Sequence, residues 1–311
     1  MPFDIYHKET VAVLTTRSIP RPFEIGELAK AAEFRFWPNV LTLQAPVVAV
    51  LWQLLLARSM HLRLNPFEPW ALALAVWLIY VADHLIDTAQ PVRSAWEPPR
   101  KDFCRRHWGT FLAIAVVVAF LLAACVSRLL WVATVRGGCQ LLLGVAGYFT
   151  LIHVMPSHWR RDWPREIAVA VLFTVGTFGA VFLANGQQAK PLLAPSLLFM
   201  LLCWANCSLI ETWEWQATGS PAAEAPNRLA RWAAEHVISV SALLAVMSGL
   251  LRLASFLPAE FALALCLSGA LLSLLSICRR AVPVRLVSPA ADLALCAPLV
   301  LLLFLWFTPA K

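Results

Sequence analysis

The sequence predicts an all-helical, polytopic membrane protein with about nine transmembrane helices. Of its 311 residues, 60% are hydrophobic and only 14% are charged, and the mean hydropathy is +0.71. A soluble domain is usually about 45–50% apolar and about 25% charged. In addition, apolar runs of roughly 20 residues recur along the chain, which is the length of a helix that crosses a bilayer. We therefore expect one bundle of helices in lipid.

The first 36 residues differ from the rest because they are mixed in polarity and are interrupted by Pro20 and Pro22. Within them, residues 23–36 place apolar side chains near helical spacing with Glu and Lys between them. This pattern is typical of a short helix that lies on a membrane surface. The predicted domains are a cytoplasmic N-terminal segment (1–36) and a single transmembrane helical domain (37–311).

The transmembrane spans follow from the apolar runs. Nine are expected, with eight or ten as alternatives, and each boundary is good to a few residues. The nine spans cover residues of about 40–60, 69–88, 109–127, 131–154, 165–184, 192–213, 236–255, 259–278 and 290–307.

The basic residues orient these spans. With the N-terminus in the cytoplasm, 18 of the 25 Lys and Arg residues lie on the cytoplasmic side and 7 on the opposite side. Such an excess marks the cytoplasmic face of membrane proteins. We expect an integral protein of the bacterial inner membrane, with its N-terminus in and its C-terminus out. The net charge of +7 is then explained by topology, without a nucleic-acid partner.

Two acids stand at the predicted cytoplasmic end of span two. Asp83 and Asp87 are four residues apart, so they lie on one helical face about one turn from each other. A carboxylate within an apolar span is costly, which indicates a cationic partner or a polar cavity. Hard oxygen ligands at this spacing suit Mg²⁺, which often joins one or two carboxylates to a substrate phosphate. The alternative is that both acids flank the helix just outside the hydrocarbon.

Span six carries a second polar set to the same side. Glu211 and Glu214 are three residues apart near its end, and Asn206 lies a little more than one turn deeper. The neighbouring tryptophans are typical of an interfacial aromatic belt, so the two glutamates could also belong to a solvated face. Asn206 is either a contact between helices or a site residue.

Five further residues are candidates for substrate contacts on the cytoplasmic side. Packing or topological roles are the alternative for each of them, and Asp292 is expected to open span nine as an acid at a helix N-terminus. The five candidates are His84, Tyr148, His153, Arg161 and Arg165.

At these positions the chain resembles the UbiA superfamily of intramembrane prenyltransferases. The family's first motif reads roughly Asn-Asp-x-x-Asp-x-x-x-Asp, and residues 79–87 retain its last two acids as Asp83 and Asp87. The stretch from Asn206 to Glu214 occupies the place of the second motif, Asp-x-x-x-Asp, with a different spacing. Residues 147–150 and 163–166 resemble the family's Tyr-and-Lys stretch after helix four, and residues 35–41 its lead-in to helix one.

The resemblance implies a UbiA-like bundle and a transferase activity. A prenyl group would pass from a polyprenyl diphosphate to a membrane-embedded, aromatic acceptor. Catalytic and Mg²⁺-binding roles fall on Asp83, Asp87 and Glu214. Substrate contacts fall on Asn206, Glu211, His84, Tyr148, His153, Arg161 and Arg165. The alternative is a non-catalytic or transport protein on the same scaffold that binds a lipid-like molecule, and the absent Asn-Asp of the first motif favours it.

Overall fold

The computed structural model describes residues 41–88, 99–130, 132–155, 163–218 and 225–307. The chain divides into two compact units, 1–37 and 38–311. The first unit, and with it the surface helix expected in 23–36, lies outside the described residues, as does Arg161.

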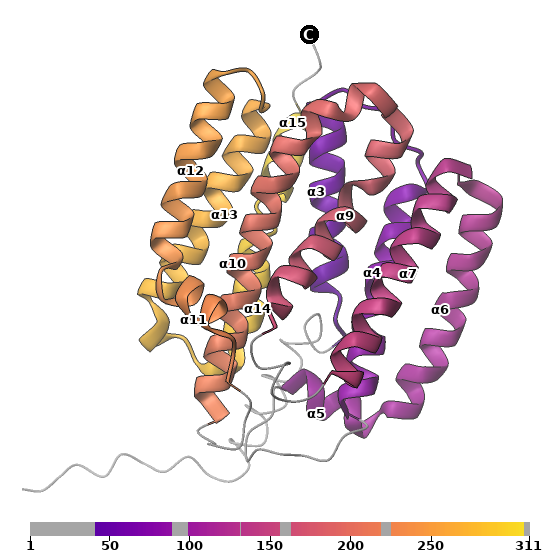
Figure 1. Cartoon of the computed structure of the whole chain (residues 1–311), viewed down its shortest axis with the longest axis vertical. Coiled ribbons are helices and arrows are strands. Elements are labelled where there is room, and N and C mark those ends of the chain that lie inside the picture. Colours follow the sequence, from indigo (N-terminus) through magenta and orange to yellow (C-terminus); the bar gives the residue numbers. More distant parts are fainter. Residues whose placement is uncertain (1–40, 89–98, 131, 156–162, 219–224, 308–311) are drawn as a thin grey trace, which may run out of the picture. The chain divides into compact units, whose positions relative to one another are not determined.

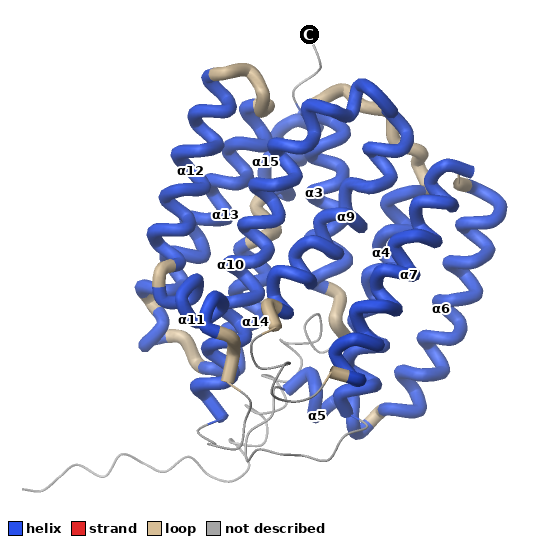
Figure 2. The backbone as a smooth tube through the Cα atoms, in the orientation of Figure 1, coloured by secondary structure: helices blue, strands red, loops and turns tan. Residues whose placement is uncertain are grey.

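The described part of the chain consists of helices joined by short turns and contains no strand (Figure 2). The helices follow one another as α3 (Gln44–Ser59), α4 (Glu68–Thr88), α5 (Pro99–Arg106), α6 (Trp108–Leu129), α7 (Val132–Val154), α9 (Arg165–Asn185), η1 (Gly186–Leu192), α10 (Leu193–Thr218), α11 (Arg228–Glu235), α12 (Val237–Leu253), α13 (Ala259–Ile277), η2 (Arg279–Ala281), α14 (Val284–Ala294) and α15 (Pro298–Phe307).

Seven stretches among the described residues are long and apolar enough to cross a membrane, which supports an integral membrane protein. They are Glu68–Thr88, Trp108–Leu129, Val132–Ile152, Arg165–Asn185, Lys190–Thr218, Ala259–Ile277 and Arg285–Phe304. Helices α11 and α12, bent by 78° at their junction, form an eighth if counted together. The first expected span corresponds to α3, which at 16 residues is shorter than the usual membrane-crossing length. The count of nine stays a prediction.

The last span differs from the expected one. It begins earlier than residue 290, because α14 already starts at Val284, and it is broken at residues 295–297 before α15 starts at Pro298. Proline suits the first turn of a helix, where its missing N–H has no partner to lose. The expectation that Asp292 opens this span was wrong: Asp292 lies in the last turn of α14.

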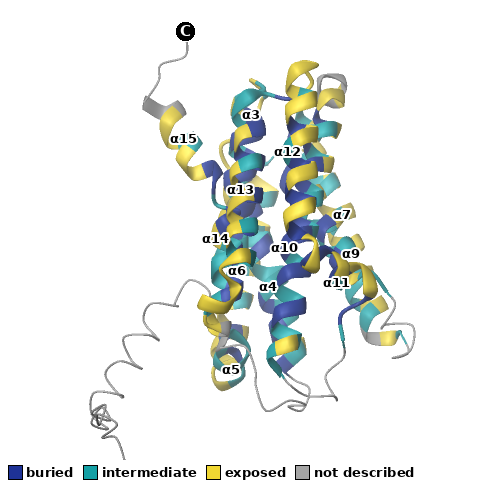
Figure 3. Cartoon of the chain, turned by 90° about the vertical axis from the view of Figure 1, so that its left-hand side faces the viewer, coloured by how far each residue is buried: buried dark blue, intermediate teal, exposed yellow. Residues whose placement is uncertain are grey.

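Helix α10 lies at the centre of the bundle and packs against α9 and against α11 to α14 (Figure 1). At the other side, α6 packs on α4, and α7 packs on α9. Phe111 is the one buried residue of α6, whereas Val117 and Phe120 are exposed. Exposed apolar residues also alternate with buried ones along α12 (Figure 3). Apolar helix faces without a protein partner are suited to contact lipid.

The aromatic core is built around Trp52 of α3. Its side chain is fully buried, and its ring centre lies 4.7 Å from that of Phe199 on α10 and 5.2 Å from that of Phe261 on α13. Its Nε1–H donates to the carbonyl oxygen of Leu295 at 2.8 Å. Leu295 stands in the break after α14, where helix-end carbonyls lack partners within the helix. Trp52 therefore both packs the core and provides a hydrogen bond to a backbone carbonyl in the interrupted last span.

We predict that Trp52→Ala lowers the free energy of unfolding in bicelles by about 3–5 kcal/mol, because a large buried ring is lost. Trp52→Phe keeps a ring but leaves the Leu295 carbonyl unpaired, so it should cost about 1–3 kcal/mol. The matched control is Trp70→Ala, because Trp70 on α4 is 70% exposed. Equal losses for Trp52→Ala and Trp70→Ala would contradict this account of the core.

Candidate functional site

Acids and bases from four helices meet at one end of the bundle, the lower end in Figure 1. Asp87 of α4 pairs with Lys101 of α5 at 2.7 Å. On α10, Glu214 pairs with Arg100 at 3.0 Å, and Glu211 pairs with Arg165 at 2.6 Å. The predicted acids of spans two and six therefore do come to the same end, although each of these three is held by its own base.

Helix α5 connects the two sets of acids. It packs against α4, and its consecutive bases point to different partners, Lys101 to α4 and Arg100 to α10. Residues adjacent in a helix are about 100° apart around its axis, which allows this division. Arg100 also donates to the hydroxyl of Ser288 on α14 at 2.5 Å. One short basic helix thus ties together α4, α10 and α14.

Arg100 is the most enclosed of these bases. Its side chain is 17% exposed, and that of its partner Glu214 is 16% exposed. Burial lowers the pKa of Arg100, but the negative charges of Glu214, Asp292 and Glu211 raise it by more. The pKa of Arg100 is therefore above its ordinary value. The guanidinium is thus firmly charged, which is the state that anion binding requires.

Asp83 is the acid least engaged by bases. Its side chain is 49% exposed, and its one ion-pair contact among the described residues is with His84 Nδ1, at 3.8 Å. It lies within electrostatic range of Asp87, Arg165, Lys101 and Arg100. His84 itself is buried, and no hydrogen-bond partner in the described structure reaches its Nδ1. Among the described residues, Asp83 is thus the acid of this cluster that has no Lys or Arg in contact.

The other predicted site residues are placed in part. Tyr148 of α7 is half-buried and lies within electrostatic range of Arg165 and Asp83, so it borders the cluster. His153 belongs to the last turn of α7, but its side chain lies outside the described part of the structure. Asn206 is buried deeper in the bundle than the cluster and lines a cavity there.

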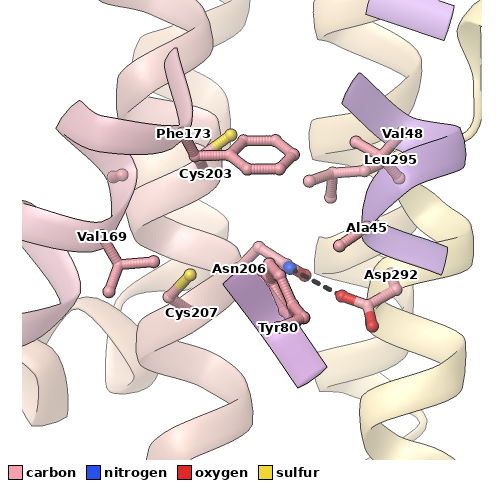
Figure 4. A pocket seen from close by; sticks show the side chains of 11 residues that line it. Ala45, Val48, Tyr80, Val169, Phe173, Cys203, Asn206, Cys207, Asp292 and Leu295 are labelled. Carbon is pink, nitrogen blue, oxygen red and sulfur yellow. Dashed lines mark hydrogen bonds between the residues drawn. The ribbon is translucent and has the colours of Figure 1, made fainter. Parts of the chain in front are cut away.

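This cavity has a volume of about 30 Å³. One wall is polar and is formed by Tyr80, Asn206 and Asp292, whereas Phe173 and Leu295 belong to the apolar wall (Figure 4). The Nδ2 group of Asn206 donates to Asp292 Oδ1 at 3.2 Å. Sequence reasoning missed Tyr80 altogether, although its position three residues before Asp83 put it on nearly the same helical face.

The donor set for a divalent cation is limited to two carboxylates. Asp83 and Asp87 supply hard oxygens of the kind that Mg²⁺ prefers, and two carboxylates plus substrate phosphate are enough for it. Glu214, the third predicted ligand, is bonded to Arg100 instead. Across the residues that the structure describes, His, Cys, Asp and Glu form no group of three or more suited to a metal ion. Asp87 is itself paired with Lys101, so Asp83 is the one predicted metal ligand that contacts no Lys or Arg among the described residues.

Comparison of the chain with models of protein families, with curated proteins and with solved structures gives no match.

We predict that Arg100→Met destabilises the protein by about 3–5 kcal/mol, because it leaves the charge of Glu214 buried without a partner. The double variant Arg100→Met with Glu214→Met should recover most of this loss, since a buried ion pair often exchanges for apolar groups at little cost. Thermal unfolding in detergent measures both.

The control for these variants is Asp102→Asn, which breaks the exposed pair of Asp102 with Arg106 on the same helix. Exposed pairs contribute about 0–1 kcal/mol. If the double variant is as unstable as Arg100→Met, the pairing does not explain the stability of this end of the bundle.

Proposed function

We propose that the protein is a UbiA-like membrane prenyltransferase, which moves a prenyl group from a polyprenyl diphosphate to a hydrophobic, aromatic acceptor in the bilayer. The observation that carries the proposal is the convergence of Asp83 and Asp87 with Arg100, Lys101 and Arg165 at one end of an apolar bundle. A diphosphate on a lipid chain needs this combination of charge at the membrane face and apolar helices beside it.

The bases bind the diphosphate in this proposal. Arg100, Lys101 and Arg165 already make charge-assisted contacts with carboxylates at 2.6–3.0 Å. Phosphate oxygens accept the same hydrogen bonds, and the planar guanidinium groups of Arg100 and Arg165 can each bind two phosphate oxygens in a bidentate geometry. The bases can therefore turn from protein carboxylates to the ligand. Their charge would then stabilise the negative charge that grows on the diphosphate as it departs.

Mg²⁺ is the proposed cofactor, held by Asp83 and Asp87, with Glu214 as a further predicted ligand once Arg100 has turned to the diphosphate. When bound, the ion neutralises charge on the leaving diphosphate. Among the described residues, Asp83 contacts no Lys or Arg and lies within electrostatic range of Arg165, Lys101 and Arg100, which suits this role. Glu211 holds Arg165 until the diphosphate binds. Tyr148, His84, His153 and Arg161 remain predicted contacts of the donor.

The scaffold and its placement form part of the same proposal. Nine spans would be reached if α3 and the bent pair of α11 and α12 both cross the membrane. The charge cluster would face the cytoplasm of a bacterial inner membrane, because the flanking segments carry most of the basic residues. Alkaline phosphatase fused after Lys311 should then be active outside the membrane, and an inactive fusion with an active cytoplasmic reporter would contradict this orientation.

One observation favours the second candidate, a protein that binds or moves a lipid-like molecule. The last span is broken at residues 295–297, one turn from Asp292, and interrupted helices beside a polar residue form binding sites in transporters. This candidate predicts stabilisation by a lipid ligand without release of diphosphate and without a need for a divalent ion.

We predict that the purified protein releases diphosphate from a polyprenyl diphosphate only when Mg²⁺ is present. Asp83→Ala and Asp87→Ala should each lower this rate by about 10²–10³-fold, the usual loss when a group that stabilises developing charge is removed. Asp102→Asn is the control, because that acid lies on the exposed side of α5. Undiminished release in both alanine variants would exclude the assigned role of the pair.

A further inference from the structure

The cavity, which lies deeper in the bundle than the charge cluster, is lined by an oxygen atom that has no hydrogen-bond partner among the described residues. Asn206 is 5% exposed, and within the described structure no donor reaches its Oδ1. Its Nδ2 group is already used by Asp292. A buried oxygen without a hydrogen bond is unfavourable by about 1–3 kcal/mol, and such groups usually have an ordered water as partner.

The cavity has the size and the chemistry for water. Its volume is about 30 Å³, and a single water needs roughly 10–15 Å³ measured in this way. Two acceptors, Asn206 Oδ1 and the carboxylate of Asp292, border the space (Figure 4). A water molecule has two hydrogens to donate and can satisfy both, whereas an aromatic ring is too large for the space that is present.

On two helices the cavity residues lie about one helical turn deeper in the bundle than residues of the cluster. Tyr80 precedes Asp83 by three residues on α4, which corresponds to a rise of about 4.5 Å. On α14, Asp292 follows Ser288, which holds Arg100, by four residues or about one turn. An attacking atom must lie about 3–3.5 Å from the reacting carbon. The first prenyl carbon of a diphosphate held in the cluster would therefore lie between the cluster and the cavity.

We propose that this cavity holds a nucleophilic water and that Asp292 is its base, so that the protein also transfers the prenyl group to water. This inference rests on the proposed binding of a prenyl diphosphate. The water oxygen forms a bond to the first prenyl carbon while the bond from that carbon to the diphosphate oxygen breaks. The electron pair of the broken bond leaves with diphosphate, and one proton of the water passes to Asp292. The products are a prenyl alcohol and diphosphate.

Asn206 is a positioning residue in this reaction. Its amide donates to Asp292 and holds the carboxylate, while its free oxygen accepts a hydrogen from the water. Tyr80 and Phe173 line the cavity on the sides of α4 and α9.

The test uses the full-length protein in bicelles with geranylgeranyl diphosphate, Mg²⁺ and water enriched in ¹⁸O, and no organic acceptor. Mass spectrometry follows the alcohol, and thermal unfolding follows donor binding. We expect geranylgeraniol that carries one solvent oxygen, together with unlabelled diphosphate. Asp292→Asn should lower the rate of alcohol formation by about 100-fold or more, which is the usual contribution of a general base. The donor should still stabilise this variant against thermal unfolding. Asp292→Glu should restore part of the rate, and Asp102→Asn should behave as the wild type.

Three results would overturn transfer to water without overturning the proposed function. The first is solvent oxygen in the phosphate products, and the second is diphosphate release that occurs only with an aromatic acceptor. The third is an Asp292→Asn variant that forms alcohol at the wild-type rate. Each of them leaves donor binding intact. If geranylgeranyl diphosphate neither stabilises the wild-type protein nor is consumed with any acceptor, the proposed prenyltransferase function itself fails, and the inference with it.

Discussion

The need to neutralise charge at one end of an apolar bundle governs this structure. Carboxylates on α4 and α10 are costly where they stand unless bases accompany them, and α5 and α9 bring those bases. Arg100 and Lys101 bind acids on two different helices, so the pairing also fixes α5 against the bundle. The position of the cavity follows, because Arg100 reaches Ser288 on α14, one turn from Asp292. Charge pairing arranges this end of the molecule together with the apolar cluster of Val81, Leu85, Cys104 and Phe111.

The same ion pairs connect stability with the proposed chemistry. A protein that binds a polyanion with buried bases must keep those bases charged and partnered when the ligand is absent, and carboxylates perform that task. Asp87, Glu211 and Glu214 have this role, whereas the one ion-pair contact of Asp83 in the described part of the chain is with His84. The ligand would then exchange one set of anions for another. In this interpretation Asp83 can bind the ion directly, whereas Asp87 and Glu214 become ligands once Lys101 and Arg100 have turned to the diphosphate.

Much of the fold could be predicted because long apolar runs can satisfy their backbone groups in a membrane only as helices. The convergence of Asp83 and Asp87 with Glu211 and Glu214 also followed from the alternation of spans. The basic partners of these acids could not be predicted, since the contacts of Arg100 and Lys101 depend on the path of the chain after Thr88. The start of the last span was misjudged, because α14 begins at Val284, accommodates Pro289 and places Asp292 in its final turn. Asp292 joins the cavity through tertiary packing that no local pattern encodes, whereas Tyr80 lies on nearly the same helical face as Asp83.

An experimental structure of the protein with Mg²⁺ and a non-hydrolysable prenyl diphosphate analogue tests the central claim most directly. The account predicts that the diphosphate lies between α4, α5, α9 and α10, that Asp83 and Asp87 face the ion, and that Arg100, Lys101 and Arg165 turn from their carboxylates to the phosphate oxygens. It also predicts an ordered water between Asn206 and Asp292. A diphosphate bound elsewhere, with the ion pairs of Asp87, Glu211 and Glu214 unchanged, would contradict it.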